Sequence, residues 1–158
     1  MAKFFETSED LVELAQEKFE QTNLAQIGIN LKIMSVSKAK NVLKVSKAGA
    51  TVQYLTNKDV FLIVYEEAFD KLTDEMQQKL MEGALSNIAY DFEKDKLSVE
   101  SDIAKELFRM RKKYENYVDM METSYAVIEQ LEEEEKQKKE EEKMRKAAEK
   151  AAKKKNKG

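Results

Sequence analysis

Two short clusters of carboxylates are the residues of this sequence best suited to chemistry. Asp91, Glu93 and Asp95 could bind Mg²⁺ or Ca²⁺ through oxygen ligands, and Glu66, Glu67 and Asp70 could supply a general acid–base pair. A carboxylate-metal hydrolase is therefore one hypothesis. No glycine-shaped coordinating loop accompanies the first cluster, and the second reads as a polar turn after an apolar run. Both clusters are interpreted as solvated acidic segments.

The absence of two residue types excludes most other catalytic chemistry. The chain contains no histidine and no cysteine. A Ser-His-Asp triad, a cysteine nucleophile, a histidine- or cysteine-ligated zinc ion and a disulfide framework are all excluded. With only four glycines, the sequence also lacks a glycine-rich phosphate loop.

One stretch of the chain nevertheless resembles an enzyme family. Residues 59–88 contain the apolar run Val60-Phe-Leu-Ile-Val-Tyr65, an acidic turn with an aromatic residue, and then a helical pattern. This order is similar to that of the phage metallopeptidases, small zincin-like proteins akin to the SprT-like group. The resemblance covers roughly residues 8–107. It implies a zincin-like scaffold whose helix carries the sequence His-Glu-x-x-His.

The ligands that this resemblance implies are missing from the sequence. Aligning the helix places Gly83 and Asn87 at the two histidine positions, Ala84 at the general-base position and Ser101 at the third ligand position. Two imidazoles at i and i+4 would hold zinc, and the glutamate would take a proton from the bound water. None of these groups is present. We therefore expect a pseudoenzyme with no catalytic residues, no zinc and no other cofactor, or a protein grouped with metallopeptidases by homology but inactive.

Charge is strongly segregated along the chain. Residues 21–58 contain six lysines and no acid, although the whole chain has a net charge of −3. Such a segment could bind nucleic acid without sequence preference, or it could be a solvated sheet face whose lysines protect exposed edges. The candidate contacts are Lys32, Lys38, Lys40, Lys44, Lys47, Tyr54, Lys58, Lys153, Lys154 and Lys155.

Hydrophobic periodicity predicts the elements that would position these residues. Helices are expected at residues 8–21 and 74–91. Strands are expected at residues 26–36, 42–45, 51–55 and 60–65, the last of them covered on both faces. Residues 47–49 are expected to form a hairpin turn between two of the strands.

A heptad pattern follows, and it predicts one long amphipathic helix over residues 102–135. The seam could pack on the chain's own domain, on another protein or on a second copy. Its residues are Ile103, Leu107, Met110, Tyr114, Tyr117, Met121, Ile128 and Leu131. Residues 136–158 have almost no large apolar side chain, so they are expected to be a fraying helix or disordered.

These patterns predict an α+β protein with a small, mostly antiparallel sheet and packing helices, followed by a long C-terminal amphipathic helix and a charged tail. The expected units are residues 1–101, 102–135 and 136–158. No signal peptide or membrane span is predicted, so a cytoplasmic protein is expected, in the host if it is phage-encoded. The leading functional hypothesis is a non-catalytic interaction protein that uses helix–helix contacts and basic surfaces.

Overall fold

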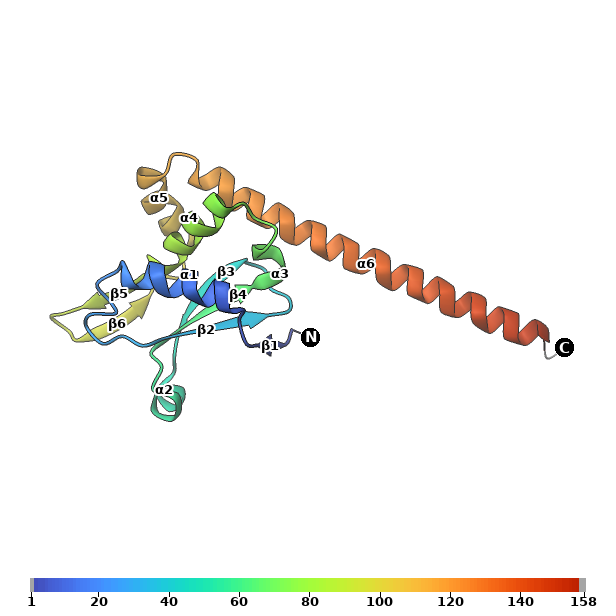
Figure 1. Cartoon of the computed structure of the whole chain (residues 1–158), viewed down its shortest axis with the longest axis horizontal. Coiled ribbons are helices and arrows are strands. Elements are labelled where there is room, and N and C mark those ends of the chain that lie inside the picture. The colour runs from blue at the N-terminus through green and yellow to red at the C-terminus, as the bar shows by residue number, and fades with distance from the viewer. Residues whose placement is uncertain (1, 157–158) are drawn as a thin grey trace.

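The computed structural model describes residues 2–156 and has the predicted α+β class. Four strands form the main sheet in the order β1-β2-β4-β3, and β5 pairs with β6 in a separate hairpin (Figure 1). The strands are β1 Phe4–Phe5, β2 Leu31–Val36, β3 Leu43–Lys47, β4 Val60–Tyr65, β5 Ile88–Asp91 and β6 Lys96–Val99. The helices are α1 Glu9–Glu20, α2 Ala50–Thr56, α3 Glu66–Phe69, α4 Asp74–Leu85, α5 Ile103–Lys113 and α6 Tyr117–Asn156.

Strand β4 is the centre of the core. It runs parallel to β2 and antiparallel to β3, and the remaining described pairs are antiparallel. Val60, Leu62 and Val64 are fully buried, whereas the alternating Phe61 and Ile63 are only partly covered. The expected strand at residues 60–65 is confirmed, and the expected cover on both faces is complete on one face and partial on the other. This alternation is that of a strand with one face in the core.

Helices α1 and α4 pack against each other, and α4 also contacts β3. The apolar spacing of α1 places Leu11, Ala15 and Phe19 on one buried face, which confirms the helix predicted at residues 8–21. Acidic residues occupy the first turn of both helices, where their negative charge interacts favourably with the positive end of the helix dipole. Helix α4, held on one side by α1, is one of the elements on which the candidate site is built.

The connection between β3 and β4 differs from the prediction. The strand expected at residues 51–55 is helix α2, and residues 47–49 form no hairpin turn, because Gly49 is the N-cap of that helix. The amide of Gln53 donates to the Asp59 carboxylate at 2.6 Å, which holds α2 against the start of β4. The strand expected at residues 26–36 is also shorter, since residues 24–28 form a turn in which Gly28 has φ of 86°, and β2 begins only at Leu31.

Helix α4 ends earlier than expected. The helix predicted for residues 74–91 stops at Leu85, and the chain enters strand β5 at Ile88. The Ser86 hydroxyl donates to the Gly83 carbonyl oxygen at 2.5 Å, and the Asn87 side chain is engaged by other elements. Ser86 thus bonds the backbone of α4, and Asn87 bonds a side chain of another element. Side-chain hydrogen bonds of this kind compete with the continuation of a helix.

The long helix expected at residues 102–135 is wrong as a single element, because the chain breaks between α5 and α6. Tyr114 has extended backbone angles, and its hydroxyl donates to Glu82 on α4 at 2.6 Å. Lys113 forms an ion pair with the same carboxylate. The break lets α6 turn back across α4, so the heptad pattern continues through two different helices.

Most of the predicted seam packs inside the chain. Met110, Tyr117, Ile128 and Leu131 are buried, Leu107, Tyr114 and Met121 are partly buried, and Ile103 is exposed. The start of α6 contacts α3, α4 and α5. The seam is therefore covered by the chain's own domain.

Beyond Glu132 the same helix continues into solvent. Residues 133–156, which we name the arm, are exposed throughout and project away from the domain (Figure 1). At 1.5 Å per residue the arm is roughly 36 Å long. The expected fraying helix is thus a continuous helix as far as Asn156, and residues 157–158 lie outside the described range. None of the helices described for residues 2–156 is long and apolar enough to cross a membrane.

Candidate functional site

Three of the four motif positions predicted from the sequence line two neighbouring hollows, and the fourth, Gly83, packs against Tyr117. Gly83 and Ala84 belong to α4, Asn87 lies in the turn before β5, and Ser101 lies between β6 and α5. Ala84 lines the inner hollow, and Asn87 and Ser101 line the outer one. Four residues line both hollows, and Glu106 of α5 is the charged one among them; the other three are Asn41, Leu43 and Ile103.

Gly83 lies against the phenol of Tyr117. A Cβ atom added at position 83 would be only 1.7 Å from the Tyr117 hydroxyl oxygen and 2.6 Å from Cζ of the same ring. Tyr117 is fully buried, so its ring has little room to move. The phenol therefore fills the space that any side chain at position 83 would need.

The buried carboxylate of Glu106 is the centre of a polar network. Its side chain is on α5 and only 5% exposed. The Tyr117 hydroxyl donates to one carboxylate oxygen at 2.9 Å, and the Asn87 amide donates to the other at 2.5 Å. Both oxygens are thus hydrogen-bonded, which offsets the cost of burying this acid.

Arg109 completes the network from the next turn of α5. Its guanidinium donates to the Asn87 amide oxygen at 2.6 Å and to the Ser86 hydroxyl at 3.2 Å. Arg109 fixes the orientation of Asn87, because the amide oxygen accepts from arginine while the amide nitrogen donates to the carboxylate. The network consequently joins α4, α5 and α6 at the position where the family motif aligns.

The environment of Tyr117 keeps its phenol protonated. Burial is the main cause of a strongly raised pKa for Tyr117, and the neighbouring Glu106 carboxylate raises it further. A protonated phenol donates its proton to Glu106. The hydroxyl is therefore a structural hydrogen-bond donor and is not poised to act as a base.

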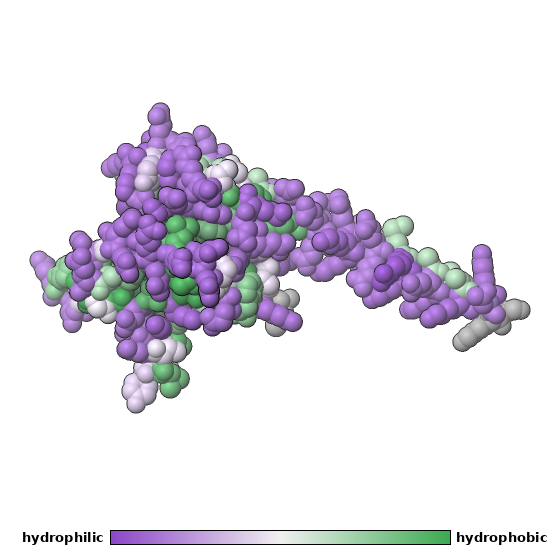
Figure 2. Space-filling model, in the orientation of Figure 1, coloured by the Kyte–Doolittle hydropathy of each residue, from purple (hydrophilic) through white to green (hydrophobic). Residues whose placement is uncertain are grey.

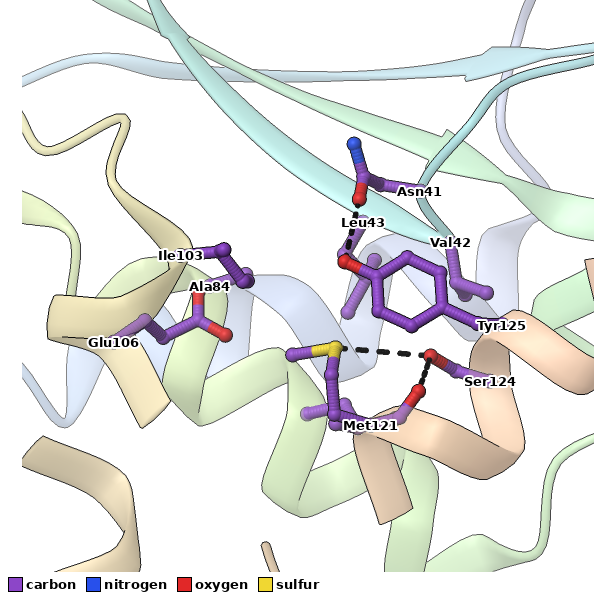
Figure 3. A pocket seen from close by; sticks show the side chains of 10 residues that line it. Asn41, Val42, Leu43, Ala84, Ile103, Glu106, Met121, Ser124 and Tyr125 are labelled. Carbon is purple, nitrogen blue, oxygen red and sulfur yellow. Dashed lines mark hydrogen bonds between the residues drawn. The ribbon is translucent and has the colours of Figure 1, made fainter. Parts of the chain in front are cut away.

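The inner hollow is too small for a substrate. Its volume is about 30 Å³, which is room for about one water molecule. Figure 3 shows Tyr125 reaching from α6 toward Asn41, and its hydroxyl donates to the Asn41 amide oxygen at 2.9 Å. Apolar side chains from β3, α4 and α5 close the remaining walls. This hollow is a packing defect beside Glu106 rather than a binding cleft.

The outer hollow is larger and more polar. It has a volume of about 230 Å³ and lies between β3 and the start of α5. Glu100, Asp102 and Glu106 contribute carboxylates to its lining, and Lys44 is its basic residue. Asp102 is already used as the N-cap of α5, where it accepts from the Ala104 amide at 3.0 Å.

The residues at the motif positions do not fit a zinc ion. Glycine, alanine and serine at these positions supply no imidazole or carboxylate, and the Asn87 amide is bound to Glu106 and Arg109. Within residues 2–156, no group of three or more histidine, cysteine, aspartate or glutamate side chains is arranged to hold a metal ion.

In each of the other two carboxylate clusters, one acid has a structural partner. Asp91 accepts hydrogen bonds from the backbone amides of Glu93 and Lys94, so it shapes the β5–β6 turn. Glu66 accepts from the buried Ser35 hydroxyl at 2.7 Å. Burial raises the pKa of Glu66, but hydrogen bonds from Ser8 and Ser35 outweigh it, so the pKa lies below its usual range.

The predicted nucleic-acid contacts are not brought together into one surface. Lys32 pairs with Glu6 at 3.3 Å, and Lys38 pairs with Glu135 at 3.7 Å. Lys44 and Lys47 lie on β3, Lys40 is exposed just before it, and Lys58 follows α2. Tyr54 is 87% exposed on α2, which protrudes far from the end of the arm that carries Lys153, Lys154 and Lys155 (Figure 1).

Sequence reasoning missed Glu106 and Arg109. Glu106 lies at helical spacing from Ile103 and Met110, so an acid on the apolar face of α5 was a detectable signal of a buried polar contact. Its partners could not be detected in the same way. Asn87 is 19 residues away and reaches Glu106 through the packing of α4 against α5, and Tyr117 reaches it because the chain breaks after α5.

Comparison with known proteins identifies one related family. A family model described as "Putative phage metallopeptidase" matches residues 3–151. The match includes the domain and most of the arm. No curated protein matches the chain, and no solved structure does.

Proposed function

The chain belongs to the phage metallopeptidase family, and we propose that it is a non-catalytic member that acts by binding other molecules. A zinc peptidase of the implied type needs two imidazoles, a third ligand and a glutamate base. This chain has no histidine to supply the imidazoles. The chain matches the family over residues 3–151 but lacks the histidines that the implied zinc chemistry needs.

The observation that carries the proposal is the contact between Gly83 and Tyr117. A ligand side chain at position 83 and the phenol of Tyr117 require the same space. The phenol in turn is held by Glu106, whose second oxygen is bound to Asn87 at another motif position. The network thus uses the aligned positions for packing and hydrogen bonding, which supports a structural role for this part of the fold.

A cleavage assay tests the proposal. The purified full chain is incubated with a fluorescently labelled unfolded protein, with added Zn²⁺, Mg²⁺ or Mn²⁺ and with or without a chelator. The proposal expects the rate of a protein-free control under every condition. Cleavage that follows the protein through purification and is abolished by the chelator would overturn it.

Sequence-independent nucleic-acid binding is the second candidate function. It is favoured by the end of the arm, where Lys153, Lys154 and Lys155 are exposed at the tip of a projecting helix. Lysines that neutralise phosphates release counterions, so the affinity would fall steeply as salt rises. The lysines at residues 32–58 lie on the domain and would add contacts only if a long strand reached from the arm to β3.

A mobility-shift assay with a short DNA duplex and a single strand tests this second candidate. We expect binding at low salt that weakens when Lys153, Lys154 and Lys155 are changed together to glutamine. The matched control changes Lys44, Lys47 and Lys58 to glutamine. No shift at low salt with the full chain would reject the nucleic-acid function.

A further inference from the structure

Within residues 2–156, the arm is exposed along its whole length and meets the domain at its base. There Glu135 forms an ion pair with Lys38, and Glu134, Lys138 and Lys139 line a shallow hollow shared with domain residues. Two internal ion pairs at i,i+4 spacing, Glu135–Lys139 and Glu142–Lys146, support the helix. A projecting helix that packs on no other element of its own domain gains little from standing alone, because most helical stability in proteins comes from packing.

The two halves of the arm carry opposite charge. Residues 133–142 contain six glutamates and three lysines, and residues 143–156 contain seven lysines or arginines and one glutamate. Met144 lies at the boundary between the halves and is 73% exposed. It is the arm's one large apolar side chain.

We infer that the arm pairs antiparallel with the arm of a second copy of this chain, with Met144 at the two-fold axis. In this register Glu133, Glu134 and Glu135 lie level with Lys155, Lys154 and Lys153 of the second copy. Lys139 lies level with Glu149, and Glu142 with Lys146. Each of these pairings occurs twice, because a two-fold interface uses the same surface on both copies.

In two places this register brings like charges together: Lys138 lies level with Lys150, and Lys143 lies level with Arg145. They are outnumbered by the complementary levels. A parallel pairing in register would instead place every glutamate beside a glutamate and every lysine beside a lysine, which is repulsive. The charge sequence therefore selects the antiparallel arrangement.

The side chains of the basic half also permit close approach. Met144, Ala147, Ala148, Ala151 and Ala152 are spaced at three and four residues, so they share one side of the helix. Figure 2 shows this side as a pale green strip along an otherwise hydrophilic arm. Small side chains leave room for a second helix, whose long lysine and glutamate stems would cover the strip.

The arrangement also fits the shape of the molecule. The arm leaves the domain in one direction, so an antiparallel pair places the two domains at opposite ends (Figure 1). This inference names a partner for the binding role proposed above, but it does not depend on the loss of catalysis. Peptidase activity would overturn the proposed function and leave the pairing unaffected.

A charge-swap experiment on the full chain tests the inference. One variant changes Glu133, Glu134 and Glu135 to lysine, and the other changes Lys153, Lys154 and Lys155 to glutamate. Sedimentation velocity at low salt is measured over a wide range of protein concentration. We expect the unchanged chain to dimerise, each variant alone to be monomeric, and an equal mixture to recover the dimer.

A cysteine variant tests the register. The chain has no cysteine, so Met144→Cys introduces a single thiol, which is expected to form an intermolecular disulfide. Glu13→Cys on the exposed face of α1 controls for random collisions. A monomeric unchanged chain at every concentration, or a mixture of the swap variants that fails to recover dimer, would overturn the inference. Mass gain only on addition of a DNA duplex would also overturn it and favour nucleic-acid binding.

Discussion

At the scale of single residues, Gly83 and Tyr117 determine what this part of the fold can do. Glycine inside a helix is less favourable than alanine by about 1 kcal/mol, so a buried glycine in α4 needs a reason. The reason is the Tyr117 phenol, which occupies the volume of a Cβ atom. Helix propensity alone predicts that alanine at position 83 would stabilise α4. The contact with Tyr117 predicts that it would destabilise the protein.

Gly83→Ala is therefore expected to destabilise the protein. Forcing a methyl group into a packed site costs roughly 1 to 3 kcal/mol, because the Tyr117 ring must move. Urea unfolding measures the change. Gly49→Ala is the matched control, since its Cβ would meet no atom within 4 Å, and it should change the free energy of unfolding by less than about 0.5 kcal/mol. Equal effects of the two variants would contradict the proposed contact.

Tyr117→Phe is expected to reduce the free energy of unfolding at pH 8. The substitution removes one of the two donors to the buried Glu106 carboxylate, and an unsatisfied buried group costs about 1 to 3 kcal/mol. Tyr54→Phe is the matched control, because it removes the hydroxyl of an exposed tyrosine. If only Tyr54→Phe lost stability, the hydrogen bond from Tyr117 to the Glu106 carboxylate would not stabilise the fold.

The stabilities of the unchanged protein and of Tyr117→Phe are expected to depend differently on pH. Folding raises the pKa of Tyr117, chiefly through burial, so the protonated phenol stabilises the fold. That contribution is fully present below the unfolded pKa of about 10 and is lost as pH rises toward the folded value. The unchanged protein should thus lose stability faster than Tyr117→Phe above about pH 10. Parallel pH curves for the two proteins would contradict the raised pKa.

At the scale of elements, the sequence predicts what depends on local periodicity. Helix α1 and strand β4 have regular apolar spacing, and both lie where they are expected. Helix α2 is missed because its β-branched and aromatic residues favour a strand, while its hydrogen bond from Gln53 to Asp59 depends on the fold and has no local signal. The end of α4 is missed because Asn87 is drawn out of the helix by residues of α5.

Helix α4 gives a prediction at this scale. Its N-cap Thr73 accepts a hydrogen bond from the Met76 amide at 3.3 Å, so Thr73→Ala should destabilise the protein by about 1 kcal/mol. Thr51→Ala in the exposed helix α2 is the control, and it should have little effect. Thermal unfolding of both variants is the measurement. No change for Thr73→Ala would mean that the cap does not stabilise α4.

At the scale of the whole molecule, the domain and the arm depend on different interactions. Leu131 is the last buried side chain, and every residue from 133 to 156 is exposed. The heptad pattern predicts helix as far as residue 135 but cannot show which surface covers the seam. Burial of Tyr117 and Ile128 against the domain answers that question, and it leaves the arm as the surface available to a partner.

Limited trypsin digestion tests this division. Exposed helix with few tertiary contacts opens more readily than a packed core, so the first cuts should fall at lysines and arginines beyond Glu135. Mass spectrometry of early fragments should show a resistant domain that ends close to Leu131. Equally early cuts at Arg109, Arg111 or Lys113 would show that α5 is no better protected than the arm.

The most direct test of the central claim is a measurement of zinc binding. Equilibrium dialysis of the full chain against micromolar Zn²⁺ gives the number of ions bound, with Glu106→Gln as the comparison. We expect no stoichiometric zinc site and the same small zinc uptake by both proteins, because the Glu106–Tyr117–Asn87 network occupies the aligned positions. One tightly bound zinc ion per chain, lost in Glu106→Gln, would contradict it.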